Sequence, residues 1–248
     1  MTFLWRALGV ELFKLKRTLA LAMVVVAPLV VVTLQLLMYM ARADTMLTAD
    51  VNPWQLMQGA LGLWSILMLP LFITLESALL AGLEHGNTQW KHLFALPVPR
   101  WSIYVAKLLT VTGLVGASLV VLVAGMQAAG FILHAYAPGM QSGSLLWVEI
   151  GRRIGFTFVA SWMAIALHTW FSLRWQSFTA SVGVGMTATV VGFIAANSDR
   201  LVPLYPWTLP INILREGAPL TGIMLYSAIS ALLIGVAGCW NIVRRDVV

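Results

Sequence analysis

Six long apolar runs alternate with short stretches that hold most of the charged residues and prolines. The runs cover residues 18–41, 54–83, 103–136, 154–173, 179–196 and 220–243. A helix needs about 20 mainly apolar residues to cross a hydrocarbon core of about 30 Å, and each run comes close to or exceeds that length. The pattern therefore predicts an all-α, polytopic membrane protein with six transmembrane helices.

The second and third runs, 54–83 and 103–136, are longer than a bilayer requires. A tilted helix, a kink at Pro70 or an extension into the cytoplasm would accommodate the additional residues. Composition agrees with a membrane protein, since 60% of the 248 residues are hydrophobic and 10% are charged. None of the polar connections is long enough to fold alone as a soluble catalytic domain, so residues 1–248 are read as a single transmembrane domain.

Basic residues indicate the orientation. An even number of spans places both termini on one side, and basic residues favour cytoplasmic flanks. With both termini in the cytoplasm, ten of the 15 Lys and Arg residues lie inside. These are Arg6, Lys14, Lys16, Arg17, Lys91, Arg100, Lys107, Arg174, Arg244 and Arg245. We therefore predict a multi-pass protein of the cell (inner) membrane with both termini cytoplasmic.

The remaining five basic residues are balanced outside by acidic ones. Arg42, Arg152, Arg153, Arg200 and Arg215 are matched by Asp44, Asp50, Glu149, Asp199 and Glu216. The net charge of +6 is therefore a property of the inner face. A basic rim against anionic lipid headgroups explains this charge, and membrane lipid rather than nucleic acid is the expected partner. Arg152 and Arg153 are read as lipid anchors at the outer start of the fourth span.

Residues 1–17 have the pattern of an amphipathic helix in the inner membrane interface. Leucines recur at helical spacing, at Leu4, Leu8, Leu12 and Leu15, and basic residues lie elsewhere on the helix. Glu11 shares the apolar side. A local ion pair with Lys14 is the favoured interpretation, and a contact with a partner protein is the alternative.

Residues 199–219 are apolar but cannot form one spanning helix, because prolines interrupt them. The prolines are Pro203, Pro206, Pro210 and Pro219. Irregular backbone exposed to lipid is not tolerated, so we predict a re-entrant helical hairpin that dips in from the outer face and returns. An ordinary loop anchored by Tyr205 and Trp207 is the alternative.

The stretch 84–100, between the second and third runs, has the composition of a short cytoplasmic amphipathic helix. Gly86 and Asn87 permit a sharp turn, and Thr88 can cap a helix. Apolar anchors and helix-stopping prolines follow at Trp90, Leu93, Phe94, Leu96, Pro97 and Pro99. A soluble motor protein can bind such a protrusion and transmit its movement through it. The alternative is a passive interfacial helix.

The same stretch carries a family resemblance. Its order is Glu84-x-Gly86-x-Thr88, then apolar residues, proline, Arg100 and Lys107. This order resembles the inner loop of type-2 ABC exporter permeases. Three short segments resemble, more narrowly, the lantibiotic-immunity and bacitracin-resistance branch of this family. They are Glu84-His85, Trp90-Lys91-His92-Leu93 and Leu96-Pro97-Val98.

The resemblance implies a permease subunit whose loop 86–95 couples it to an ATPase. The implied coupling residues are Glu84, Gly86, Thr88, Trp90, Lys91, Leu93 and Phe94. Two ABC ATPase subunits and a second permease subunit, identical or homologous, are the implied partners. The substrate would be hydrophobic or amphipathic, such as an antimicrobial peptide or a drug. The sequence has no G-x-x-x-x-G-K-[ST] phosphate loop, so no cofactor is expected in this chain, and ATP and Mg²⁺ belong to the partner ATPase.

Few polar residues inside the spans suggest chemistry of their own. Glu76 and Lys107 form a candidate intramembrane polar site, in which Glu76 either has a structural partner such as Lys107 or handles substrate or protons. His134 and His168 have no neighbours at metal-ligand spacing, so no metal site is expected. A non-transporting sensor or assembly subunit is the alternative function. An intramembrane enzyme fits less well, because no nucleophile and base pair is evident.

Overall fold

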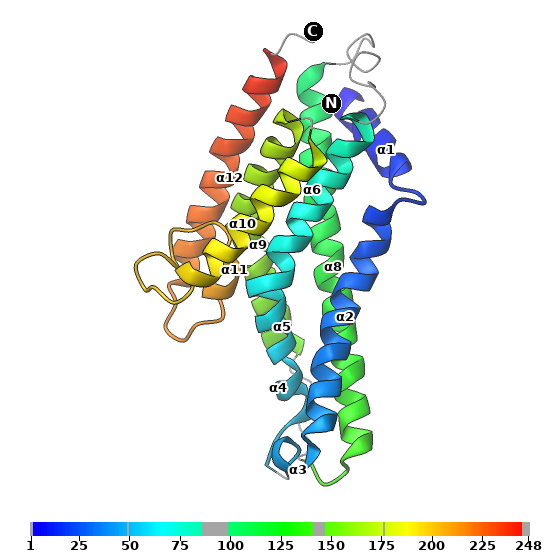
Figure 1. The fold of residues 1–248 in the computed structure, drawn as a ribbon, viewed down its shortest axis with the longest axis vertical. Coiled ribbons are helices and arrows are strands. Elements are labelled where there is room, and N and C mark those ends of the chain that lie inside the picture. Colours follow the sequence, from blue (N-terminus) through cyan, green and yellow to red (C-terminus); the bar gives the residue numbers. More distant parts are fainter. Residues whose placement is uncertain (1, 49, 86–98, 141–146, 176, 245–248) are drawn as a thin grey trace.

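Helices make up all the regular secondary structure of the described residues. The computed structural model describes residues 2–48, 50–85, 99–140, 147–175 and 177–244 (Figure 1). Six of its helical segments are long and apolar enough to span a membrane. They are Leu19–Ala41, Pro53–Glu84, Arg100–Tyr136, Val148–Arg174, Phe178–Ala195 and Leu220–Val243. The predicted all-α fold with six membrane-spanning helices is confirmed.

The chain begins with α1 (Thr2–Lys14), which packs against α8. It turns into α2 (Leu19–Ala41) at Arg17, whose φ of 65° lies in the left-handed region. The apolar side of the N-terminal helix faces the bundle with one exception. Leu15 is buried and Glu11, which shares that side, is only 4% exposed, but Leu12 is 53% exposed. The leucine at position 12 is therefore on the outer side of α1, and a carboxylate lies on the inner side.

The second span is built from several short pieces after the four-residue helix α3 (Ala43–Met46). These pieces are α4 (Pro53–Met57), α5 (Gly59–Leu63), the π-helical turn η1 (Trp64–Met68) and α6 (Leu69–His85). A kink at Pro70 was one of the predicted ways to accommodate the length of this span, and the structure has a π-helical turn just before that proline. Pro70 has no N–H to donate to the carbonyl of Ile66, which lies within η1, so the α-helical ladder is interrupted there.

The third span, α8 (Arg100–Tyr136), is one continuous helix of 37 residues. At 1.5 Å per residue it is about 55 Å long, well beyond a hydrocarbon core of about 30 Å. In Figure 1 it runs the full length of the molecule. The third span is therefore longer than a bilayer requires, as the sequence predicted.

The fourth span, α9 (Trp147–Arg174), begins seven residues before the predicted start at 154. The charged residues that suggested a loop lie within its first turns. There Arg152 and Arg153 donate hydrogen bonds to Glu149 at 2.8 and 2.7 Å, so these charges pair along the helix surface. Pairs at these spacings stabilise a helix, which is why it extends through them.

The last helices are α10 (Phe178–Ala195), the short α11 (Leu209–Asn212) and α12 (Leu220–Val243). Between α10 and α12 the chain turns back on itself, and α11 is the single α-helical piece of residues 199–219, where a hairpin of helices was expected. The segment folds onto its neighbours. Tyr205 donates to the carbonyl of Ala188 on α10 at 2.8 Å, and Leu209 is fully buried where α11 packs on α9.

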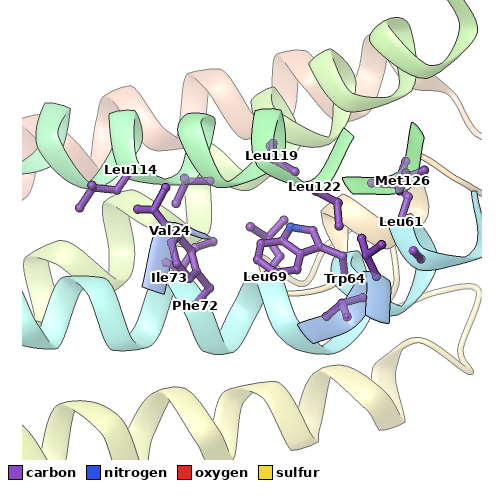
Figure 2. Packing of buried hydrophobic residues seen from close by; sticks show 14 of the residues in the cluster. Val24, Leu61, Trp64, Leu69, Phe72, Ile73, Leu114, Leu119, Leu122 and Met126 are labelled. Carbon is purple, nitrogen blue, oxygen red and sulfur yellow. The ribbon is translucent and has the colours of Figure 1, made fainter. Parts of the chain in front are cut away.

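A continuous apolar core lies between α2, α6, α8 and α9. Trp64 of the π-helical turn is fully buried, and Figure 2 shows it facing Leu119 and Leu122 of α8. Nearer the end that carries the termini, Val24 of α2 and Ile73 of α6 continue this core (Figure 2). The core joins the first three spans into one unit.

Small residues let helices approach closely at two points. Gly130 of α8 leaves room for Trp54, since a Cβ there would lie 2.6 Å from the indole ring. Ser227 of α12 is fully buried, and its hydroxyl lies 2.9 Å from the carbonyl of Val159 on α9. The small-residue stripe of α12, Ser227, Ala231, Gly235 and Cys239, thus packs at Ser227 within this chain.

Both termini lie at the same end of the molecule, together with the end of α6 and the start of α8 (Figure 1). We predict that this end is cytoplasmic. In a Cys239→Ser background, an impermeant maleimide added outside intact cells should label a cysteine placed at Asp44 and spare one placed at Thr88. External labelling at Thr88 would contradict the predicted orientation.

Candidate functional site

Four charged side chains from three helices meet at the end of the molecule that carries the termini. Glu11 and Lys14 come from α1, Glu84 is the next-to-last residue of α6, and Lys107 lies in the third turn of α8. We call these four residues the ion cluster. It joins the N-terminal helix to the two spans that flank residues 86–98.

Both ammonium groups bridge the two carboxylates. Lys107 Nζ lies 2.6 Å from Glu84 Oε1 and 2.8 Å from Glu11 Oε2. Lys14 Nζ lies 2.9 Å from the same Glu84 oxygen and 3.1 Å from Glu11 Oε1. The four groups therefore form a closed ring of alternating charge, with no net charge.

Most of the ion cluster is buried. Glu84 and Lys107 are 0% and 1% exposed, whereas the Lys14 side chain is 24% exposed. Contacts of 2.6–3.1 Å replace part of the lost hydration of the buried charges, and Glu84 Oε2 has no hydrogen-bond partner among the described residues. Burial acts to lower the pKa of Lys14, but the carboxylates of Glu84 and Glu11 outweigh it and raise this pKa above its usual value. The Lys14 ammonium thus stays charged at neutral pH.

The ion cluster lies beside the end of the second span. Glu84 is followed by His85, the last residue of α6, and then by residues 86–98. The Glu84 carboxylate links α6 to α1 through Lys14 and to α8 through Lys107 by charge-assisted hydrogen bonds. The ends of three helices are therefore joined at this place.

Two of the sequence-predicted site residues are brought together here, and others are not. Glu84 and Lys107 form the shortest contact of the ion cluster. Lys107 was named as an example of a structural partner for Glu76, and in the structure Lys107 contacts Glu84 and Glu11 instead. Among the described residues neither carboxylate oxygen of Glu76 has a hydrogen-bond partner. The predicted coupling residues Gly86, Thr88, Trp90, Lys91, Leu93 and Phe94 lie outside the described residues.

Glu76 is fully buried on an apolar face of α6. Its spacing from Ile73 and Leu80, three residues before and four after, places it on the same side as those two core residues. The nearest side-chain contact from this part of α6 to α9 involves another residue, Ser77, whose hydroxyl lies 3.5 Å from that of Thr169. Glu76 is therefore separate from the ion cluster.

The histidines are held by aromatic rings. His168 is stacked on Phe171 and meets Trp207 edge-on, with ring centroids 6.1 and 6.4 Å apart. His134 lies 5.9 Å from the ring of Trp54. In the part of the chain that the structure describes, no three His, Cys, Asp or Glu side chains are grouped to hold a metal ion.

The sequence analysis singled out all four residues of the ion cluster but did not predict that they contact one another as a group. The pair of Glu11 with Lys14 was predicted, and it is present at 3.1 Å. The link to Glu84 and Lys107 was missed, because it depends on how α1 packs against α8. A usable signal was the carboxylate of Glu11 on the apolar side of its helix, which required a buried cation nearby.

Comparison with known proteins gives one match. A family model described as ABC-2 family transporter protein matches residues 7–195. These residues contain the whole ion cluster and the first five membrane-spanning helices. No curated protein and no solved structure matches the chain.

Proposed function

Because the chain belongs to the ABC-2 family of transporter proteins, as a non-catalytic transmembrane subunit, we propose that it is the permease of an ATP-driven exporter. In this proposal two separate ABC ATPase chains supply the energy. They dock on the coupling loop, residues 86–95, and a second permease subunit, identical or homologous, completes the pathway. The substrate is a hydrophobic or amphipathic molecule, such as an antimicrobial peptide or a drug.

The observation that carries this proposal is the ion cluster. A docked ATPase can drive transport only if its movement reaches the spans without being absorbed by the loop. The contact of Glu84 with Lys107 at 2.6 Å, buried one residue before the end of α6, supplies a stiff link at that place.

The exposed faces of the outer helices are compatible with a protein embedded in the membrane. α2 and α12 are the spans at the two ends of the membrane domain in sequence, and each exposes large aliphatic side chains along its length. Examples are Val26 and Leu34 on α2, and Leu225 and Leu232 on α12. Such faces suit lipid, an amphipathic substrate or a second copy. The resemblance to the lantibiotic-immunity and bacitracin-resistance branch favours a peptide substrate.

The test is dependence on a partner. The purified chain alone should show no ATP hydrolysis above that of empty micelles. Affinity purification from its own cells should bring down a chain with a phosphate-loop motif, and the complex should hydrolyse ATP. Robust turnover by the single chain, or purification from those cells without any ATPase, would refute the proposal. An ATPase that copurifies while deletion of the chain leaves export unchanged would favour the sensor or assembly subunit.

A further inference from the structure

An open pocket lies between the ends of α9 and α12 at the end of the molecule that carries the termini. Its volume is about 450 Å³. The lining residues are Trp170, Arg174, Ala237, Trp240, Asn241 and Arg244. None of these six is acidic, and two carry guanidinium groups, so the lining complements an anion.

The two arginines have defined surroundings. The guanidinium of Arg244 lies over the ring of Trp240, 4.3 Å from its centroid, and that of Arg174 lies 5.9 Å from the centroid of Trp175. Contact with an indole ring restricts the orientation of a guanidinium group. Arginine in this setting favours oxyanions such as phosphate.

Arg244 is not the residue that caps the last carbonyl group of α12. A basic residue at a helix end often binds the last carbonyl groups. At the end of α12 that position is taken by Arg100, which donates to the carbonyl of Val243 at 3.2 Å. Arg244 thus adds positive charge beside a helix end whose last carbonyl already has a cationic partner.

The depth of the pocket identifies the kind of anion. Arg174 is the last residue of α9, and Arg244 directly follows α12, so the pocket lies where two membrane-spanning helices end. Tryptophan and arginine at that level are typical of the headgroup layer. One turn deeper on the same face of α12, Leu233 and Val236 are 64% and 62% exposed. The cationic pocket therefore continues into an apolar surface directed toward the bilayer.

We propose that this pocket binds the phosphate group of an anionic phospholipid, with the acyl chains lying along the exposed face of α12. Two guanidinium groups and the amide of Asn241 hold the headgroup, and the leucine and valine contact the chains. A free phosphate ion would meet the same cations but would gain nothing from the apolar surface. This inference does not depend on the proposed function.

Native mass spectrometry tests it. Protein released from micelles doped equally with phosphatidylglycerol and phosphatidylcholine of identical acyl chains should retain phosphatidylglycerol preferentially. Because two basic residues near the membrane surface are lost, the Arg174→Gln, Arg244→Gln double variant should show this preference weakened roughly 30-fold. The matched control Arg42→Gln, Arg200→Gln removes the same charge elsewhere and should keep it.

Other outcomes would overturn the proposal. Equal retention of both lipids by the unaltered protein would show that no anionic headgroup is selected. Undiminished preference in the Arg174→Gln, Arg244→Gln variant would place the lipid elsewhere. A third arm adds inorganic phosphate to phosphatidylcholine micelles, and a phosphate adduct as strong as the lipid adduct would make the pocket a site for soluble phosphate instead. If the variant alters only dimer abundance, the surface serves a second copy.

Discussion

Replacing Lys107 by methionine is expected to lower the stability of the protein more than any single change at the surface. The substitution leaves the buried carboxylates of Glu84 and Glu11 with only Lys14 to neutralise them. Removing one partner of a buried ion pair costs about 3 to 5 kcal/mol, because a charge is left unpaired away from water. The measurement is the melting temperature of the purified protein in lipid nanodiscs.

A double-mutant cycle separates the charge effect from lost packing. Lys107→Met leaves the ion cluster with an excess negative charge, and Glu84→Gln leaves it with an excess positive charge. Together they leave Glu11 paired with Lys14 at 3.1 Å, without net charge. The double variant should therefore be less destabilised than the sum of the two single variants, by about 1 to 3 kcal/mol.

The control is an exposed ion pair in the same protein. Arg152 lies 2.8 Å from Glu149 with 55% of its side chain exposed, and exposed pairs contribute about 1 kcal/mol or less. Arg152→Met should therefore change the melting temperature little. Additive losses for Glu84→Gln and Lys107→Met would show that the two charges do not stabilise each other.

The number and type of the spans could be predicted from the sequence because they depend on length and hydropathy alone. Their detailed shape could not. Pro70 was visible in the sequence, but the interrupted ladder is absorbed at Trp64–Met68 as a π-helical turn that lets Trp64 fill the core. The start of α9 was predicted too late because the span was begun at the first apolar residue after Arg153, whereas the helix continues back through Glu149 and its arginines.

Polar contacts between helices were the least predictable feature. Glu76 and Lys107 lie at similar depths along their spans, yet Lys107 turns toward Glu84 and Glu11. Which carboxylate it meets is set by the rotation of α6 about its own axis and by the packing of α1 on α8. Neither the rotation of α6 nor the packing of α1 on α8 can be predicted from the hydrophobic periodicity of a single helix. The Arg174 and Arg244 pocket was missed for the same reason, since it exists only where α9 and α12 adjoin.

The coupling loop carries the second large expected effect. Residues 86–98 stand in the sequence between the end of α6 and Pro99, and the end of α6 and the start of α8 lie at the same end of the molecule as both termini (Figure 1). If residues 86–95 dock in a groove of the ATPase, truncating Trp90 and Phe94 should weaken assembly. Each truncation of a large anchoring side chain typically costs about 2 kcal/mol or more of binding free energy, roughly a 30-fold weaker complex.

Glu84→Ala should behave differently from these two variants. Glu84 is fully buried against Lys107 and has no exposed surface to offer a partner. Its loss would weaken the link between the loop and the spans without removing a docking contact. Cells with this variant should assemble the complex and lose export, provided that the variant is inserted in the membrane at normal levels.

Pull-down of the ATPase by the tagged permease, with substrate resistance measured in the same cells, distinguishes these outcomes. Trp90→Ala with Phe94→Ala should lose both ATPase binding and resistance, whereas Glu84→Ala should lose resistance alone. Trp5→Ala is the matched control, because Trp5 is 70% exposed on α1 and lies outside the loop. It should retain both. Normal ATPase binding and normal resistance in the Trp90→Ala, Phe94→Ala variant would mean that residues 86–95 form a passive interfacial segment. The force of the ATPase would then have to reach the ion cluster by another surface.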